Sequence, residues 1–289
     1  STMLVWGLEY YDIILFASLA PILEMYFFPS KTAILSAIET WGAFASTYFV
    51  RPVGAVLFGW VGDVHGRRLA TIADAALVGL ATLAIGLLPT YYTAGILAPV
   101  LLYLMRILQG IGLGGEAGGG ATWALELTPR NVRPYINGVM YSGLSWAVFL
   151  TSFVTLSAKK VMHQAFSLYG WRILFITGAI PALIALIIRL WGSESLEWIE
   201  QVRSRGTVKV PLSIVLSRYW VPFIALILIN LGLTIYYYGG SGYWYYIMPK
   251  LIAPKLQLSA DKAYTWALVL GMYGGIGAVV GELLSGFLI

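Results

Sequence analysis

The sequence predicts an all-α integral membrane protein, and three observations support this. Of its 289 residues, 59% are hydrophobic and 11% are charged, whereas ordinary soluble domains have about 25% charged residues. The mean hydropathy is +0.80, so a soluble globule of this composition would precipitate. About eight apolar runs are long enough to cross a bilayer, which takes about 20 predominantly apolar residues per helix.

Six of the predicted helices form a first transmembrane bundle over residues 1–191. Charged residues, Pro and Gly bound them, and they cover residues 4–28, 38–61, 69–89, 97–125, 135–157 and 171–190. The more polar stretch 192–218 predicts a cytoplasmic linker. Two further helices, 219–248 and 263–289, begin a second bundle over 219–289.

A short internal repeat supports this division into two halves. "GAVLFGWVGD" places Gly54 and Gly59 five residues apart, and "GELLSGFLI" does the same with Gly281 and Gly286. Repeated halves are common in transporters. In this register the residue after Ile289 would match Asp63, so we expect the sequence to be a fragment that stops before a second copy of the motif.

Composition also excludes several kinds of site and partner. The chain has no cysteine, which excludes disulfides and thiolate metal sites. His65 and His163 both fall in predicted loops, so we expect no metal site and no cofactor. The net charge of +5 is scattered over short loops, which is typical of loops beside membrane helices rather than of a nucleic-acid-binding surface. The distribution of Lys and Arg favours a multi-pass protein of the cell membrane with a cytoplasmic N-terminus.

Ionisable residues inside the predicted helices are the main functional signal. A charge at the bilayer centre costs at least about 2.5 to 3.5 kcal/mol, and such residues commonly mark substrate and proton pathways. Asp74 is expected instead to face a loop or the membrane surface, and the role of Glu282 stays open. The candidates for the substrate and proton pathway are Glu9, Asp12, Arg51, Arg106, Gln109 and Glu116.

The spacing of these candidates predicts how they meet. Glu9 and Asp12 share one face of the first helix, and Arg106 lies on the same face of the fourth helix as Gln109 and Glu116. The acids can carry protons. The arginines stay charged, so they suit anion binding or neutralisation of an acid. Alternatively, the pairs only hold the helices together.

Glycines in the fourth helix predict close packing. Gly110, Gly114 and Gly118 recur at intervals of four, as do Gly115 and Gly119. Small residues at this spacing let two membrane helices approach closely. A phosphate-binding loop would need a preceding strand, and none is predicted.

Two other segments each allow two interpretations. In "GWVGDVHGRR", residues 59–68, a turn at Gly66 beside Asp63, Arg67 and Arg68 can form a gate of charge pairs, or it is simply a positively charged cytoplasmic turn. "YYYGGSGYWYY", residues 236–246, is either a broken helix at a transporter site or an aromatic belt at the membrane interface.

Together these segments resemble the metabolite:H+ symporter family of the major facilitator superfamily. The resemblance covers essentially the whole first half. It rests on "EYYD" at 9–12, "RPVGAVLFGWVGDVHGRR" at 51–68, "RILQGIGLGGE" at 106–116, "ELTPRNVRP" at 126–134 and "WRILF" at 171–175.

The resemblance implies a major facilitator type helical bundle, of which this chain holds the N-terminal six-helix half and about two helices of the second half. It also implies proton-coupled uptake by alternating access. Asp63, Gly66, Arg67 and Arg68 would form an inward-side gate, with Glu126 and Arg133 in the same charge network. Val64 stands where the motif usually has a basic residue. "ESLEW" at 194–198 lacks the usual proline.

The leading hypothesis is a secondary transporter that symports a small metabolite with protons, with an organic acid slightly favoured by the two arginines. The alternative is a non-transporting accessory or structural subunit built on the same fold, which would have partner subunits in a membrane complex. An enzyme is not expected, because no nucleophile and base stand at a recognisable spacing. The expected partners are the lipid bilayer, protons and a small-molecule substrate.

Overall fold

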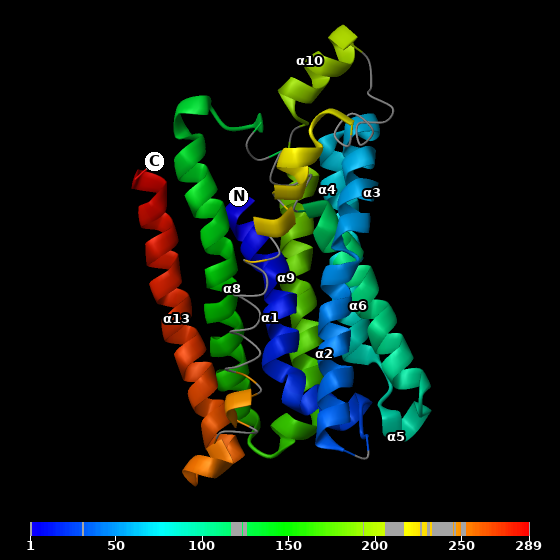
Figure 1. Ribbon diagram of the computed structural model, residues 1–289, viewed down its shortest axis with the longest axis vertical. Coiled ribbons are helices and arrows are strands. Elements are labelled where there is room, and N and C mark those ends of the chain that lie inside the picture. Colours follow the sequence, from blue (N-terminus) through cyan, green and yellow to red (C-terminus); the bar gives the residue numbers. More distant parts are fainter. Residues whose placement is uncertain are drawn as a thin grey trace.

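In the computed structural model the chain is a bundle of long helices that run nearly parallel to one another (Figure 1). The structure describes residues 2–30, 32–116, 123, 126–192, 194–205, 217–225, 227–229, 232, 245, 247–249 and 253–288. Within these residues every regular element is helical, which confirms the predicted fold class.

Seven helical stretches of the described chain are long and apolar enough to cross a membrane. They are built from α1 (Thr2–Phe27), α2 (Ala33–Phe49) with α3 (Arg51–His65), α4 (Arg67–Leu87), α6 (Leu97–Gly115), α8 (Arg133–Met162), α9 (Trp171–Trp191) and α13 (Ala260–Leu288). Shorter elements connect or flank them: α5 (Tyr91–Ala94), η2 (Arg130–Val132), η3 (Phe166–Gly170), α10 (Leu196–Arg205) and η5 (Ala253–Leu256). The predicted helix 219–248 and the stretch 236–246 lie largely outside the described residues.

The second predicted helix is interrupted. Sequence periodicity predicts one helix over 38–61, but α2 ends at Phe49 and α3 begins at Arg51, with Val50 between them. Pro52 lies in the first turn of α3. Because proline has no backbone N–H, it cannot donate to the preceding turn, and the break falls where that hydrogen bond would have been.

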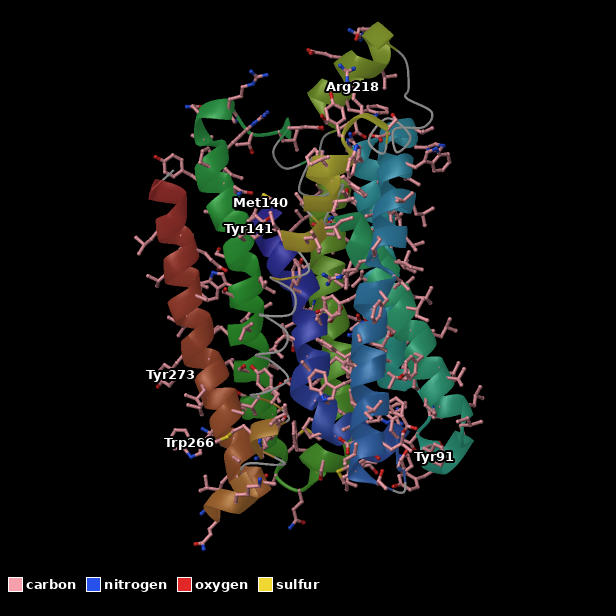
Figure 2. The ribbon with its side chains drawn as sticks, viewed as in Figure 1. Tyr91, Met140, Tyr141, Arg218, Trp266 and Tyr273 are labelled. Atoms are coloured by element: carbon pink, nitrogen blue, oxygen red, sulfur yellow. The ribbon has the colours of Figure 1, made fainter. Side chains whose placement is uncertain are left out.

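The helices pack around α1, which lies at the centre of the bundle against α8 and α9 (Figure 1). On one side, α4 packs between α6 and α9, and α3 packs on α6. On the other side α13 lies alongside α8. Trp266 and Tyr273 on α13 point outward from the bundle (Figure 2) and are exposed, as expected for residues that face lipid.

The glycines of α6 bring it into backbone contact with α2 and α3. A Cβ atom on Gly110 would lie 2.2 Å from the carbonyl oxygen of Thr47, and one on Gly114 would lie 2.1 Å from that of Arg51. No residue with a side chain fits at such separations. The predicted packing role is therefore confirmed for these two glycines, whereas Gly118 and Gly119 lie outside the described residues.

Candidate functional site

The centre of the bundle holds a chain of polar side chains that links α1, α4 and α6. Arg106 Nη1 donates a hydrogen bond to Gln109 Oε1 at 2.8 Å, and Gln109 Nε2 donates to Thr82 Oγ1 at 2.8 Å. Thr82 Oγ1 in turn donates to Asp12 Oδ2. Asp12, Thr82, Gln109 and Arg106 are all buried. An acid and an arginine from different helices are thus connected through two neutral side chains and do not touch directly.

Thr82 is the junction of this chain. Its hydroxyl lies 2.8 Å from the carbonyl oxygen of Val78 as well as within hydrogen-bond distance of Asp12. A hydroxyl has one proton to donate and two lone pairs that accept. Thr82 can therefore donate to an ionised Asp12, or it can donate to the Val78 carbonyl and accept a hydrogen bond from a protonated Asp12. The site has hydrogen-bond partners ready for both states of the carboxyl group.

Small and aromatic residues also lie against Asp12 and Arg106. Asp12 Oδ1 has no hydrogen-bond partner among the described residues and faces Gly178 of α9, where a Cβ atom would lie 3.3 Å away. The guanidinium of Arg106 stacks over the ring of Phe16, 4.2 Å from its centroid. A cation on an aromatic face is stabilised where water is excluded, so the fixed positive charge is held by packing as well as by Gln109.

No contact among the described residues connects Arg51 to this chain. Its guanidinium lies 4.4 Å from the ring centroid of Tyr48 and 5.7 Å from that of Tyr10, and the residue is only partly buried. Its guanidinium atoms Nε and Nη2 are nevertheless buried in this conformation, as is the whole side chain of Arg106. The side chain of Glu9 lies outside the described part of the structure, so its predicted pairing stays a prediction.

Glu116 belongs to a second cluster. Seven residues of helix separate it from Gln109, about 10 Å along the axis, so sharing a helical face does not bring it to Arg106. Its Oε2 accepts from Arg189 Nη2, and Arg189 Nη1 lies 2.6 Å from Asp74 Oδ1. Asp74 is 1% exposed. The expectation that Asp74 faces a loop or the membrane surface is therefore wrong, because an arginine from α9 pairs with it inside the bundle.

The loop between α3 and α4 forms a third polar group of residues. Arg67 Nη1 lies 2.7 Å from Asp63 Oδ1, and Arg67 Nε lies 3.9 Å from Glu126 Oε1. Arg133 Nε donates to the carbonyl oxygen of Thr128 at 3.1 Å. The structure thus brings Asp63, Arg67 and Glu126 together.

Glu194, the first residue of "ESLEW", completes this group, although it was not among the predicted site residues. Both of its carboxylate oxygens lie 3.2 Å from the backbone nitrogen of Arg68, in the first turn of α4. A negative charge at a helix N-terminus satisfies a free N–H and complements the helix dipole. Trp198 Nε1 also donates to the carbonyl oxygen of Asp63 at 3.1 Å. The "ESLEW" segment therefore ties the end of α9 to the α3–α4 turn even without its proline.

Gly66 is required at this turn for two reasons. Its φ of 114° is one that residues with side chains rarely adopt. A Cβ atom there would also overlap the Glu194 carboxylate.

Sequence reasoning thus missed four contributors: Thr82, Arg189, Glu194 and Trp198. Thr82 carries no charge and looks like any helix threonine. Arg189 lies near the end of its apolar segment, where an arginine ordinarily extends to the membrane surface. Asp74 and Glu116 lie in other predicted helices and had no basic partner assigned to them. Only this could have suggested that Arg189 pairs with them.

Comparisons with known proteins agree with this architecture. The model of the family described as "Sugar (and other) transporter" matches residues 3–207. The inner membrane metabolite transport protein YhjE of Escherichia coli is 34% identical over 216 residues, which are 74% of this chain and 49% of that protein. The shikimate transporter of Escherichia coli is 31% identical over 227 residues, 77% of this chain and 52% of that protein.

The chain spans about half the length of these curated relatives. Among solved structures, that of a D-xylose-proton symporter superposes with a TM-score of 0.71 at 20% identity and covers 93% of this chain and 64% of that one. A second, titled as a major facilitator superfamily proton:xylose symporter bound to 6-bromo-6-deoxy-D-glucose, also gives 0.71, at 17% identity, over 97% of this chain and 67% of that one. The chain therefore belongs to the sugar (and other) transporter family, and it has the fold of a major facilitator superfamily protein.

Proposed function

We propose that the protein containing this chain is a secondary transporter that symports a small metabolite with protons by alternating access. The observation that carries the proposal is Asp12, a buried acid at the centre of a membrane bundle whose partner, Thr82, can serve both its charged and its protonated form. Buried intramembrane acids of this kind are the usual carriers of protons in transporters.

In this proposal the two arginines have different roles. Arg106 is 0% exposed and connects to Asp12 through Gln109 and Thr82, so it stabilises the ionised carboxylate. Arg51 shares no described contact with that chain and is flanked by the rings of Tyr48 and Tyr10, and we assign substrate binding to it. A guanidinium recognises a carboxylate through paired hydrogen bonds, which favours an organic acid.

The names of the relatives support a substrate that carries a carboxylate group, although they name several different compounds. They include proteins named as a shikimate transporter and an alpha-ketoglutarate permease, and both names denote carboxylate compounds. Others are named as putative proline/betaine transporters, whose substrates also carry a positive charge. All of these compounds have a carboxylate, the group that Arg51 would recognise.

The α3–α4 turn is proposed as the inward-side gate, in a protein whose N-terminus is cytoplasmic. The turn and its flanking residues include Asp63, Gly66, Arg67 and Arg68. The proposed gate also includes Arg133, the first residue of α8, and Glu126, which precedes α8 in the sequence. Contacts from Glu194 and Trp198 hold the turn against the segment that follows α9. Residues 192–218 would link the bundle 1–191 to a second bundle that begins at 219.

The test is solute uptake into proteoliposomes made with the intact protein. A binding screen of organic acids, amino acids and betaines first identifies the substrate. With an inward proton gradient, we expect the unaltered protein to accumulate the solute and Asp12→Asn to abolish this accumulation. Arg51→Gln should weaken it by raising the substrate concentration required for half-maximal uptake. Glu39→Gln, which alters an acid near the opposite end of the bundle from the proposed gate, is the matched control.

Uptake that survives both Asp12→Asn and Arg51→Gln unchanged would contradict the mechanism. A protein that moves no solute and purifies from native membranes in a fixed ratio with other subunits would instead be an accessory subunit.

A further inference from the structure

A buried ionic triad lies in the bundle away from Asp12. Arg189 Nη1 contacts Asp74 Oδ1 at 2.6 Å, and Arg189 Nη2 contacts Glu116 Oε2. Arg189 Nη1 also donates to the carbonyl oxygen of Thr71. The exposed fractions are 1% for Asp74, 5% for Glu116 and 2% for Arg189. Three helices, α4, α6 and α9, thus meet at one group of charges.

The triad and the Asp12 site lie one above the other on shared helices. Asp74 and Thr82 are about two turns apart on α4, about 12 Å along its axis, and Glu116 and Gln109 are separated by a similar distance on α6. Between the two sites Val78 packs against Gly112, where a Cβ atom would lie 2.6 Å from Val78 Cγ2. An apolar contact therefore separates the two polar groups.

The charges of the triad do not balance. Arginine stays protonated in proteins, so two ionised carboxylates beside one arginine leave a net charge of −1. An uncompensated charge removed from water costs several kcal/mol, and two acids that share one site commonly keep one proton between them. Asp74 Oδ2 has no hydrogen-bond partner among the described residues and offers a position for that proton.

We propose that Asp74, Glu116 and Arg189 form a second proton-binding site, which holds one proton shared between the two carboxyl groups. Protonation makes the triad neutral and keeps both acids bonded to Arg189. No described hydrogen bond links the site to Asp12, because Val78 and Gly112 lie between them, and the site binds its proton whether or not the protein transports a solute.

Other ionisable groups lie on the helices packed around the triad. Among the described residues, none of these groups forms a hydrogen bond or ion pair with Asp74 or Glu116. They are Arg67 and Arg68 on α4, Arg106 and Tyr103 on α6, Arg172 on α9, Arg51, Asp63 and His65 on α3, and Glu9, Tyr10, Tyr11, Asp12, Glu24 and Tyr26 on α1.

Infrared spectroscopy of the purified intact protein tests the proposal, because a protonated carboxyl group has a C=O stretching band that a carboxylate lacks. We expect such a band at neutral pH in the unaltered protein. Asp74→Asn and Glu116→Gln should each remove it, because either change leaves one acid and one arginine, which neutralise each other without a proton. Asp12→Asn is the control and should leave the band of the triad in place.

Three results would overturn the proposal. The first is a full set of protonated-carboxyl bands in both Asp74→Asn and Glu116→Gln. The second is the absence of any such band in Asp12→Asn, a test that does not require the triad variants to fold. The third is a band that appears only when sodium is removed, which would make a metal cation the occupant. Failure of proton-coupled uptake would leave the predicted spectra unchanged, so the two proposals fail separately.

Discussion

At the scale of single residues, the chemistry of the proposed carrier depends on Thr82, a residue with no charge. Its hydroxyl accepts from Gln109 and lies within reach of both Asp12 and the Val78 carbonyl. A buried carboxyl group that gains and loses a proton needs a partner in each state, because an unsatisfied buried polar group costs about 1 to 3 kcal/mol. By turning its hydroxyl about the Cβ–Oγ1 bond, Thr82 can be a donor to the ionised carboxylate or an acceptor for the protonated one.

Replacing this hydroxyl should therefore impair transport. We expect Thr82→Val, which keeps the shape but removes the hydroxyl, to lower proton-driven uptake by about tenfold or more, since a loss of about 1.4 kcal/mol is a factor of ten. Thr82→Ser keeps the hydroxyl and should retain most of the uptake. Equal rates for the two variants would show that shape alone matters at this position.

Gly66 makes a second prediction for a single residue. Gly66→Ala forces a side chain into a φ of 114° and displaces Glu194 from the first turn of α4. Gly95→Ala is the matched control, because Gly95 has a φ of 58° but open space around it. The Gly66 variant should lose about 1.5 to 3 kcal/mol more stability than the control, the value of a hydrogen bond to a charged group. Thermal unfolding in detergent measures both, and equal losses would remove the role of Glu194.

At the scale of helices, glycine spacing decides which pairs approach most closely. Gly54 on α3 meets the backbone of α6 at Ile111, where a Cβ atom would lie 1.9 Å from the carbonyl oxygen. In a membrane, where apolar burial does not favour one helix pair over another, such close packing is a main source of association. The sequence predicted this role for α6 because spacing along one helix is visible in the chain.

Two glycines of α3 allow a matched test. Gly54→Ala should destabilise the protein by about 1 to 3 kcal/mol, the usual cost of overpacking. Gly59 has no atom within 4 Å of an added Cβ, so Gly59→Ala should be neutral or stabilising, because alanine favours helix. Denaturant or thermal unfolding compares them. Similar effects for the two changes would contradict the close contact between α3 and α6.

What the sequence did not predict at this scale has a physical cause in each case. The break at Val50 was not predicted because the long apolar run around it favoured one continuous helix, and Pro52 was not interpreted as a helix start. The separation of Glu116 from Arg106 follows from helix rise, since a shared face does not mean a shared height. Arg189 could not be assigned, because its partners lie on α4 and α6, and only packing brings them to α9.

At the scale of the whole molecule, α13 packs mainly on α8 and also contacts α1. Lys159 Nζ lies 2.7 Å from Asp261 Oδ1, and Tyr264 Oη donates to the carbonyl oxygen of Ser18 at 2.6 Å. A Cβ atom on Gly271 would lie 3.4 Å from Ser152 Cβ. If 1–191 and 219–289 belong to two halves that rock against each other, this is a contact between them. Composition predicted the fold class and the motifs predicted the family, but neither could predict this pairing.

The absence of cysteine from the sequence makes the pairing of α8 with α13 easy to test. In Ser152→Cys with Gly271→Cys, the two Cβ atoms would be close to the separation of about 3.5 to 4.5 Å that a disulfide requires. Mild oxidation should therefore protect both thiols from maleimide labelling that is carried out after denaturation in SDS, a step required because Ser152 is buried in the folded protein. Ser152→Cys with Gly277→Cys is the control, because Gly277 has open space around it, and its thiols should stay reactive. Equal labelling of the two pairs would contradict the arrangement.

The most direct test of proton coupling through Asp12 separates net accumulation from exchange. In proteoliposomes made with the intact protein, the proposal predicts that Asp12→Asn fixes the carrier in its protonated form. The variant should then exchange labelled for unlabelled substrate at equal pH while losing accumulation against a gradient, and substrate should no longer drive protons into the vesicles. Accumulation and substrate-driven proton entry at the rates of the unaltered protein would contradict the claim.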